Sequence, residues 1–476
     1  MKVLSAASEL FPLVKTGGLA DVTGALPAAL KPQGVAMRSI VPGYTAVMAA
    51  LENPQAVLHY DDLFGAEARL VAGTAQGIDI IAVDAPHLYN RPGNPYLGPD
   101  GKDWNDNGQR FAALSMAAAD VAGGAIPGYQ PDILHAHDWQ TALAPVYVKF
   151  RGGPKTVMTV HNIAFQGQFP ASLFAALKLP PQAFSIDGVE YYGNVSFLKG
   201  GLACASAIST VSPSYAQEIC TPEYGMGLDG LLRARRGVIS GIVNGIDTQV
   251  WNPAADANIA AAYTAKTLEK RTVNKRAIEK RFRLDEGDGL LHGVVSRLTW
   301  QKGMDIFAAA LDQLVANGAR LALIGTGEAQ IEREIIAAAE RHPGRIGAVM
   351  GYDEALSHLM QAGCDTILVP SRFEPCGLTQ LYGLRYGSVP VVARTGGLAD
   401  TVIDANDAAL NANVATGFQF SPVDQFSLEH ALGRAARCYA DPPAWKAMQI
   451  RGMESDVSWD RSASLYAGLY RNLLNP

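Results

Sequence analysis

Short apolar runs alternate with longer segments of helical periodicity along most of the chain. Each run is rich in Val, Ile or Leu and is followed by a polar or glycine-rich turn, which is the pattern of a buried strand. Repeated alternation of strand and helix predicts parallel sheets with helices on both faces. The expected strands are VLSAAS (3–8), IDIIAVD (78–84), DILHAH (132–137) and TVMTVHN (156–162), then LLHGVVSR (290–297), ARLALIGTG (319–327), DTILVPS (365–371) and VPVVART (389–395), with helices at 303–317, 328–341 and 353–363.

Two blocks of this alternation predict two doubly wound α/β domains. The strand VISGIV (238–243) ends in the turn sequence NGID, so we expect the boundary between Val243 and Asn252. The charged segment that follows, 266–288, has the spacing of an exposed helix, and 461–474 has that of an amphipathic helix. The expected division is therefore a first domain at 1–245, a second at 246–456, and a C-terminal segment at 457–476.

The composition is that of a globular protein and narrows the possible partners. The 476 residues are 48% hydrophobic and 18% charged, and 39 Lys and Arg against 45 Asp and Glu leave a net charge of −6. A mildly acidic chain without a basic run argues against nucleic acid and anionic membranes as partners. Its oligomeric state cannot be derived from the sequence.

The cysteines and the apolar segments indicate a reducing compartment, which we take to be the cytoplasm. The five cysteines are scattered and form no C-x-x-C pair, so neither a disulfide framework nor a cysteine zinc site is expected. Glu9 and Lys15 interrupt the apolar start of the chain, which therefore resembles a strand and loop more than a signal peptide. No apolar run reaches the roughly 18 residues of a membrane span.

The sequence TGGLAD occurs twice, at 16–21 and at 395–400, each time after a basic residue. Two glycines before a helix let backbone N–H groups approach a ligand, and the helix N-terminus and Lys15 add positive charge. This arrangement suits a diphosphate, although Gly-Gly turns before helices are also common without a ligand. We favour two equivalent loops that face one cleft from two domains.

Two later segments add charged groups at strand ends. Arg297 and Lys302 follow a strand of the second block, where open α/β sheets bind ligands, and two cations suit a departing diphosphate. Glu374 follows another strand and could accept hydrogen bonds from sugar hydroxyls, while the N–H groups of Leu378 and Thr379 open the next helix towards a phosphate. The alternative for the two cations is an ordinary solvated surface.

The segment His135-Ala136-His137-Asp138-Trp139 offers a third candidate. Two histidines on one face of a strand end resemble part of a metal site, but no third ligand has a recognisable spacing, so no metal is expected. The Asp138 carboxylate and the Trp139 indole suit a sugar ring instead.

Taken in order, KTGGLADV (15–22), SRLTWQKG (296–303) and SRFEPCGLTQLYGLRYG (371–387) resemble the motifs of the bacterial glycogen synthase and plant starch synthase family. The resemblance covers nearly the whole chain. It implies two Rossmann-like domains facing a central cleft, the GT-B type, with the last helix crossing back to the first domain. It also implies transfer of glucose from ADP-glucose to the non-reducing end of an α-1,4-glucan such as glycogen, with retention of configuration and without a metal or other cofactor.

The resemblance assigns roles to individual residues. Arg297 and Lys302 would neutralise the departing ADP, Glu374 would hold glucose hydroxyls, and His161 would lie near the transferred glucosyl group. The nucleotide sugar would further contact Lys15, Gly18, Tyr352 (stacked on the adenine), Cys376, Leu378, Thr379, Gly396 and Gly397, and the substrate side would involve Asp21, Tyr96, Asp138 and Asn244.

One departure and several alternatives remain open. Related transferases carry a second glutamate eight positions after the first, where this chain has Tyr382, so a carboxylate contact to the ribose is not expected. UDP-glucose is an alternative donor, because the base pocket cannot be deduced from the residues. A silent nucleotide-sugar or glucan-binding protein is the non-enzymatic alternative. A phosphorylase and a nicotinamide oxidoreductase are less favoured, because neither a pyridoxal-phosphate lysine segment nor G-x-G-x-x-G after the first strand is present.

Overall fold

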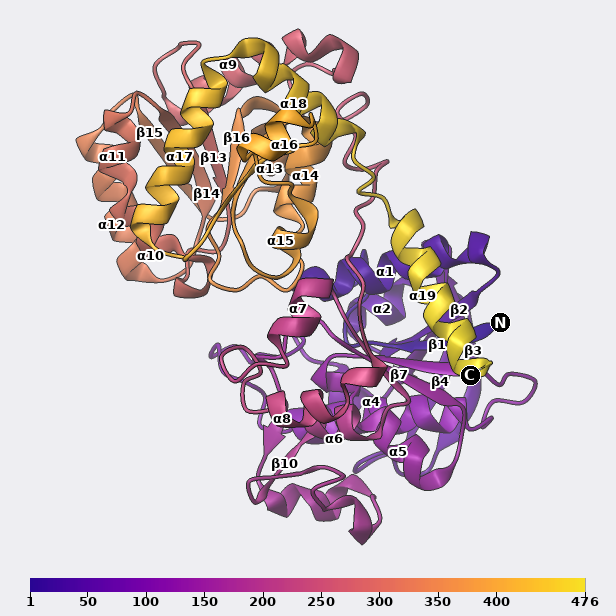
Figure 1. Ribbon diagram of the computed structural model, residues 1–476. Helices are drawn as coiled ribbons and strands as arrows, with labels where there is room; N and C mark the ends of the chain where they lie inside the picture. The colour runs from indigo at the N-terminus through magenta and orange to yellow at the C-terminus, as the bar shows by residue number, and fades with distance from the viewer. Residues whose placement is uncertain (476) are drawn as a thin grey trace. The chain divides into compact units, whose positions relative to one another are not determined.

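The computed structural model describes residues 1–475, which form two compact units (Figure 1). Unit 1 comprises Met1–Asn244 together with the segment that begins at Trp459, and unit 2 comprises Gly245–Ser458. Both are α/β structures built on a largely parallel sheet, as the alternation of strand and helix predicts.

Unit 1 is built on a nine-stranded sheet in the order β12-β11-β7-β6-β1-β2-β5-β4-β3. Its parallel strands follow the order of a doubly wound sheet, because β1 lies in the middle and the chain builds outward first on one side and then on the other. β4 runs antiparallel to both of its neighbours, β3 and β5, and the other described pairs of this sheet are parallel. The strands are β1 (Lys2–Ala6), β2 (Ala36–Pro42), β3 (Glu52–Tyr60), β4 (Ala68–Ala75), β5 (Ile78–Asp84), β6 (Ile133–His137), β7 (Lys155–Val160), β11 (Ala207–Thr210) and β12 (Ile239–Gly241).

The C-terminal helix α19 (Trp459–Leu474) packs beside α1 (Gly18–Leu30) on one face of this sheet (Figure 1). Its buried Tyr466 and Tyr470 share an apolar core with Val3 and Ile133 of the sheet. The remaining elements of unit 1 are α2 (Thr45–Ala50), α3 (Pro86–Tyr89), α4 (Asn107–Ala122), α5 (Leu143–Arg151), α6 (Phe197–Cys204), α7 (Pro213–Glu218), α8 (Asp229–Ala234) and a small sheet of β8 (Gln168–Phe169), β10 (Asn194–Ser196) and β9 (Glu190–Tyr191), with 3₁₀ turns at Lys31–Gln33, Trp139–Thr141, Ala171–Leu177, Pro181–Ala183 and Arg236–Val238.

Unit 2 contains a six-stranded parallel sheet in the order β15-β14-β13-β16-β17-β18, which is the Rossmann order 3-2-1-4-5-6. The strands are β13 (Leu291–Val295), β14 (Arg320–Gly325), β15 (Ile346–Met350), β16 (Thr366–Val369), β17 (Val389–Ala393) and β18 (Phe418–Phe420). Two apolar clusters pack against this sheet, as a doubly wound fold requires. The helices are α9 (Arg271–Phe282), α10 (Met304–Ala309), α11 (Leu311–Ala316), α12 (Ala329–Arg341), α13 (Glu354–Gly363), α14 (Thr379–Tyr386), α15 (Gly396–Thr401), α16 (Asp407–Asn411), α17 (Gln425–Tyr439) and α18 (Pro442–Glu454), with 3₁₀ turns at Ala265–Lys270 and Trp300–Lys302.

Two expectations about unit 2 helices were wrong. The segment 303–317 is divided into α10 and α11. The segment 266–288 is not one exposed helix: a 3₁₀ turn precedes α9, the helix ends at Phe282, and one of its faces is buried. That face carries charged residues that find partners beneath it, so the sequence shows no apolar stripe although the helix is packed.

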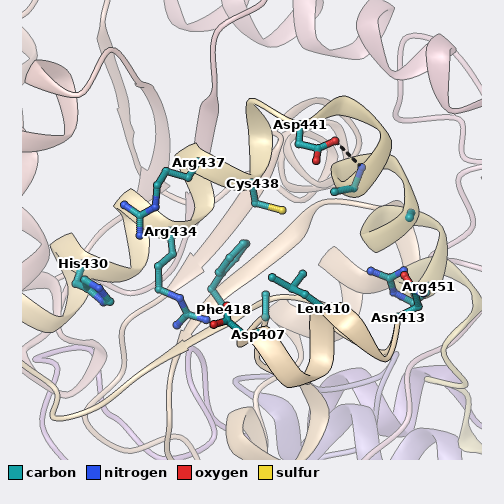
Figure 2. Close-up of a pocket in the computed structure, with 13 residues that line it drawn as sticks. Asp407, Leu410, Asn413, Phe418, His430, Arg434, Arg437, Cys438, Asp441 and Arg451 are labelled. Carbon is teal, nitrogen blue, oxygen red and sulfur yellow. Dashed lines mark hydrogen bonds between the residues drawn. The ribbon is translucent and has the colours of Figure 1, made fainter.

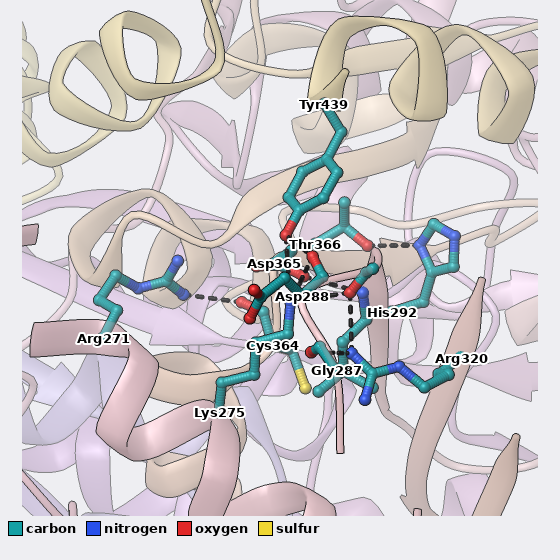
Figure 3. A network of polar contacts seen from close by, with 12 residues as sticks. Arg271, Lys275, Gly287, Asp288, His292, Arg320, Cys364, Asp365, Thr366 and Tyr439 are labelled. Carbon is teal, nitrogen blue, oxygen red and sulfur yellow. Dashed lines mark hydrogen bonds and ion pairs between the residues drawn. The ribbon is translucent and has the colours of Figure 1, made fainter. Parts of the chain in front are cut away.

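The buried face of α9 is held by an ionic network (Figure 3). The Lys275 ammonium donates to Asp365 Oδ2 at 2.7 Å, to the Gly289 carbonyl at 2.8 Å and to the Tyr439 hydroxyl at 3.1 Å. Nearby, buried Arg320 pairs with buried Glu279 of α9. All three Lys275 donors are therefore satisfied, which is the condition under which buried charge is tolerated.

Removing one partner of this network should destabilise unit 2. We expect Lys275→Met to lower the free energy of unfolding by about 3 kcal/mol, because Asp365 would remain buried without its cation. Urea denaturation of the full chain would measure the change. The control is Arg341→Ala on α12, whose pair with Asp312 has side chains 52% and 64% exposed and should contribute about 0.5 kcal/mol or less. Equal effects of the two substitutions would contradict the expectation.

Candidate active site

The predicted site residues of unit 1 gather at the point where its strand order reverses. β1 and β6 are neighbours, yet their following connections leave in opposite directions, and open α/β sheets generally bind ligands at the carboxyl ends of such a strand pair. The loop after β1 carries Glu9 and Lys15, and the turn after β6 carries Asp138. His161 follows the adjacent strand β7.

Glu9, which the sequence analysis used only to argue against a signal peptide, organises the loop before α1. Its buried carboxylate accepts from the Thr16 N–H at 2.5 Å, from the Thr16 hydroxyl at 2.6 Å and from the Gly17 N–H at 3.4 Å. It also accepts from the Tyr96 hydroxyl. The only sign of this role in the sequence is that a single acidic residue interrupts an apolar run. Nothing in the sequence indicates which groups contact its carboxylate.

The loop expected to face a diphosphate is bonded to Glu9 at two of its backbone N–H groups. The N–H groups of Thr16 and Gly17 both donate to the Glu9 carboxylate. Lys15 lies at the surface and pairs with Asp21 at 2.8 Å. A side chain added at Gly17 or Gly18 would meet open space, so the fold itself does not demand either glycine.

Tyr96 lies beside this loop, but its hydroxyl is directed inward. It bonds to Glu9 and to the Ser8 hydroxyl, the latter at 2.8 Å. Burial and the Glu9 carboxylate raise the tyrosine pKa well above its ordinary value, so the phenol stays protonated. The Tyr96 hydroxyl therefore contacts the loop after β1, through Ser8 and Glu9.

Asp138 occupies a strained position at the end of β6. Its φ of +56° with ψ of −177° is a conformation that non-glycine residues rarely adopt, at a cost of about 1–3 kcal/mol. Its carboxylate accepts from the backbone N–H of His161 at 2.7 Å and of Asn162 at 3.4 Å. Burial raises the pKa of Asp138 to about 7, against the lowering effect of those two donors. Strain held in this way is characteristic of functional sites.

His161 belongs to a buried group of three histidines. Its Nε2 lies 3.0 Å from Nδ1 of His137, whose ring stacks on that of His135 with centroids 4.0 Å apart. Burial lowers the pKa of His135 and of His161 to about 3. The rings are thus engaged with one another. Within residues 1–475, no group of three or more His, Cys, Asp or Glu side chains has a geometry that could hold a metal ion.

Two other residues near this edge differ in their surroundings. The Trp139 indole packs edge-on against Phe111, with centroids 5.1 Å apart, and beside Phe169 and Phe197, so it belongs to an aromatic cluster. Asn244, the last residue of unit 1's first segment, is 7% exposed, and its Oδ1 has no hydrogen-bond partner among the described residues. A buried unpaired oxygen of this kind is expected where a ligand donor completes the site.

In unit 2 the predicted residues also gather where the strand order reverses, between β13 and β16. Lys302 Nζ donates to Glu374 Oε2 at 2.5 Å, and the Ser371 hydroxyl donates to the same oxygen at 2.9 Å. Gly303, with φ of +67°, lies so close to the Pro370 carbonyl that a side chain would collide with it. That close approach brings Lys302 to the end of β16.

Arg297 lies on the same edge and is exposed. Among the described residues no carbonyl or carboxylate pairs with its guanidinium. The neighbouring Arg372, to which the sequence gave no role, is different: it forms two bonds with Asp305 at 2.6 and 2.8 Å and lies over the Trp300 ring. Arg372 therefore fastens the 300–305 turn, and Arg297 is left available for an anion.

The loop after Glu374 is packed against the second TGGLAD segment. The Gly397 N–H donates to the carbonyls of Glu374 and Pro375, both at 3.1 Å. Gly396 has φ of +43°, and side chains at Gly396 or Gly397 would collide with the 374–376 backbone. Cys376 is buried in this contact, while Leu378 and Thr379 begin α14. The Gly397 N–H is thus bonded within the protein.

Tyr352 and Tyr382 have opposite surroundings. Tyr352 is 73% exposed at the start of the segment before α13 and presents its ring to solvent. Tyr382 stacks on Trp251, with centroids 3.6 Å apart and an interplanar angle of 16°, and Trp251 stacks on His358 on its other side. The residue that replaces the second glutamate of related transferases is therefore a packing element.

A separate groove of about 540 Å³ lies on unit 2 and contains none of the predicted residues (Figure 2). It is lined from α16, α17 and α18 by Arg434, Arg437 and Arg451 together with Asp407 and Asp441. Arg434 is held by Asp404, and the groove includes no residue from the carboxyl ends of β13 or β16. In the described part of the chain, none of the helices is long and apolar enough to cross a membrane.

The buried histidines should make stability fall in acid. In the unfolded chain a histidine binds a proton below about pH 6.5, whereas folded His161 stays neutral down to about pH 3, so protons favour the unfolded state between these values. At pH 5 one such group costs about 2 kcal/mol relative to pH 7.5. Urea unfolding at both pH values should show a smaller loss for His161→Asn than for the unsubstituted chain, and equal losses would contradict the neutral state of His161.

Comparison with known proteins places these features in a family. Residues 2–234 match the model of the starch synthase catalytic domain, and residues 275–439 match that of glycosyl transferases group 1. The chain is 58% identical to a glycogen synthase of Rhodopseudomonas palustris over 100% of this chain and 99% of the relative. It is 59% identical to glycogen synthase 1 of Rhizobium meliloti over the same shares.

A solved structure agrees with these matches. The catalytic domain of starch synthase IV from Arabidopsis thaliana, bound to ADP and acarbose, superposes with a TM-score of 0.88 at 33% identity, over 100% of this chain and 99% of that one. The expected fold class and family are thereby confirmed. The chain belongs to the family of bacterial glycogen synthases and starch synthases, which are glycosyltransferases of the GT-B fold.

Proposed function

We propose that the chain transfers glucose from ADP-glucose to the non-reducing end of an α-1,4-glucan such as glycogen, with retention of configuration. The observation that carries this proposal is the group formed by Arg297, Lys302 and Glu374 at the reversal point of the unit 2 sheet. An unpaired cation beside a lysine–carboxylate pair suits a ligand that joins a diphosphate to a sugar. The starch synthase IV structure contains ADP and acarbose, which supports the same ligand classes.

The leaving group sets the chemistry of the unit 2 residues. As the bond between glucose and the diphosphate breaks, negative charge grows on the phosphate oxygens and positive charge grows on the sugar. Arg297 and Lys302 would stabilise the former, together with the N–H groups of Leu378 and Thr379 at the start of α14. Tyr352, which is exposed, would stack on the adenine.

Glu374 suits the role of a hydroxyl ligand better than that of a nucleophile. Lys302 and Ser371 both bond to its Oε2, so the carboxylate charge is already compensated. Its Oε1 remains for a sugar hydroxyl. Retention would then arise by attack of the acceptor hydroxyl on the face that the diphosphate leaves, with the phosphate taking the proton. A glucosyl adduct on Glu374, detected by mass spectrometry, would contradict this mechanism.

Unit 1 would supply the groups that hold the glucan and the transferred glucose. Asp138, Asn244 and His161 present polar atoms near the carboxyl edge of its sheet, and Asn244 Oδ1 is the unpaired acceptor among them. We assign residues 1–245 to the acceptor side, 246–456 to the nucleotide sugar, and 457–476 to a helix that completes the first domain. We expect no metal requirement, no nucleic acid or membrane partner, and action in the cytoplasm.

The donor is decided by one assay. The purified chain is incubated with glycogen and either ADP-glucose or UDP-glucose, and the released nucleotide diphosphate is measured. Faster release with ADP-glucose, together with incorporation of labelled glucose into glycogen, is the expected result. Preference for UDP-glucose would overturn the donor assignment, and release with neither donor would favour a silent binding protein.

Removing either the unpaired Arg297 or the paired Lys302 should slow the chemical step of the reaction. We expect Arg297→Ala or Lys302→Ala to lower kcat about 10²–10³-fold at saturating donor and glycogen, because each removes a donor aimed at the developing phosphate charge. Arg437→Ala, an exposed arginine of the separate groove, is the matched control and should leave kcat unchanged. Near-normal kcat in both test variants would reject these roles.

The Glu9 carboxylate should matter through the loop that it holds. Glu9→Gln leaves one acceptor oxygen where the carboxylate offers two, so the backbone N–H and hydroxyl donors that converge on Glu9 can no longer all be accepted, and the Lys15 loop should lose its fixed position. We expect kcat/KM for ADP-glucose to fall about tenfold or more, since misplacement by about 1 Å is costly. Tyr96→Phe, which removes only one donor to Glu9, should have a smaller effect. A larger effect of Tyr96→Phe would contradict this order.

A further inference from the structure

Polar side chains form a buried row across the unit 1 sheet, one residue layer below the carboxyl ends of its strands. His135 Nε2 lies 2.5 Å from the Thr159 hydroxyl, which lies 2.5 Å from that of Ser209, so the row crosses β6, β7 and β11. The other nitrogen of His135, Nδ1, lies 2.8 Å from the Tyr470 hydroxyl of α19. Both nitrogens of His135 are thus occupied, and its ring is fixed in place.

His137 connects this row to His161. Two residues after His135 on the same face of β6, its ring rests on the fixed His135 ring at a centroid distance of 4.0 Å. Its Nδ1 lies 3.0 Å from His161 Nε2. Its own Nε2 is buried and has no hydrogen-bond partner within the described chain.

Because His137 Nε2 has no hydrogen-bond partner, the donor in the hydrogen bond between His137 and His161 can be assigned. Burial keeps these rings neutral by lowering their pKa values, so each carries one proton. If His137 Nδ1 accepted the bond, the His137 proton would be on Nε2, and a buried N–H would have no acceptor. Orphaned buried N–H groups are rarer than under-satisfied acceptors, so the His137 proton belongs on Nδ1, from which it is donated to His161 Nε2. His161 must then carry its own proton on Nδ1.

We propose that His137 is a positioning residue that fixes His161 as the neutral Nδ1–H tautomer, so that His161 offers a hydrogen-bond donor, and not a base, to an oxygen of the bound sugar. The part that concerns the sugar rests on the proposed function, in which His161 lies beside the transferred glucosyl group. A neutral donor places no positive charge next to a sugar that itself becomes positive. The tautomer of a functional histidine is commonly set in this way by the partner of its other nitrogen.

Two substitutions of His137 separate positioning from packing. His137→Asn loses the stacked ring but places an amide N–H close to the position of Nδ1, whereas His137→Phe keeps the ring and loses the donor. Packing alone would make the Phe variant the better enzyme. The proposal requires the opposite: Asn within about threefold of the unsubstituted kcat, and Phe lower by about tenfold. Melting temperatures of both variants establish that each is folded.

The pH dependence of kcat is the second measurement. Burial, which lowers the pKa of His161 to about 3, persists in both variants, so His161 should stay neutral above about pH 5 in each. The Phe variant should therefore show the same fractional loss of kcat at every pH from about 5 to about 8, because the loss comes from the tautomer and not from a charge. Asp138, the other titratable group in contact with the His161 backbone, has a pKa of about 7 and affects all three proteins alike. A kcat of the Phe variant equal to that of the unsubstituted chain at every pH, or a loss confined to acid pH, would overturn the proposal.

The tautomer itself can be observed without turnover. In the ¹⁵N-histidine-labelled chain, the His161 signal is identified by its disappearance in His161→Asn, and its ¹⁵N shifts report which nitrogen holds the proton. We expect a protonated Nδ1 in the unsubstituted chain and a mixture of tautomers in His137→Phe. A protonated Nε2 in the unsubstituted chain would overturn the proposal, whatever the activity. Absence of glucan synthesis alongside the expected shifts would instead reject the proposed function and leave the positioning role in place.

Discussion

The reversal of strand order in a parallel sheet is the constraint on which both groups of functional residues depend. Where two adjacent strands send their connections to opposite sides, the loops at their carboxyl ends separate and leave room for a ligand. β1 and β6 do this in unit 1, and β13 and β16 do it in unit 2. Residues far apart in sequence, such as Lys302 and Glu374, become hydrogen-bonded neighbours at such a point.

Each reversal point is organised around one buried carboxylate, but the two are compensated differently. Glu9 receives hydroxyl and backbone N–H donors, which carry no net charge, whereas Glu374 receives the Lys302 ammonium. The unit 1 point therefore presents carboxylates with neutral donors around them, and the unit 2 point presents cations. Carboxylates and neutral polar groups suit the hydroxyls of a glucan, and cations suit a diphosphate, which agrees with the division of labour proposed for the two units.

The repeated TGGLAD sequence shows how one motif meets two physical requirements. In unit 2 the glycines are demanded by the fold, because the 374–376 backbone leaves no room for a side chain at Gly396 or Gly397. In unit 1, by contrast, a Cβ atom at Gly17 or Gly18 would meet no other atom within 4 Å. The second copy supports the Glu374 loop, and the first is shaped by the Glu9 carboxylate.

The sequence alone determined the α/β class, the position of most strands and the family, because apolar runs and long ordered motifs are local properties of the chain. It also named Arg297, Lys302, Glu374 and His161, since the residues at strand ends can be found from the pattern. It could not show that α9 has a buried face, because that face carries charged residues such as Lys275 and Glu279 and therefore forms no apolar stripe in the sequence. What decides their burial is a set of partners about 40 to 90 residues away.

The tertiary structure alone decided which polar groups face one another. The Glu9 carboxylate accepts hydrogen bonds from four donors, and the Tyr382 ring stacks on that of Trp251. His137 contacts the two histidines on either side of it. Hydrogen bonds and ring stacking depend on distances of a few ångströms across different strands, and no spacing along the chain encodes them. The fold is thus largely a local consequence of the sequence, and the states of its functional side chains are a consequence of packing.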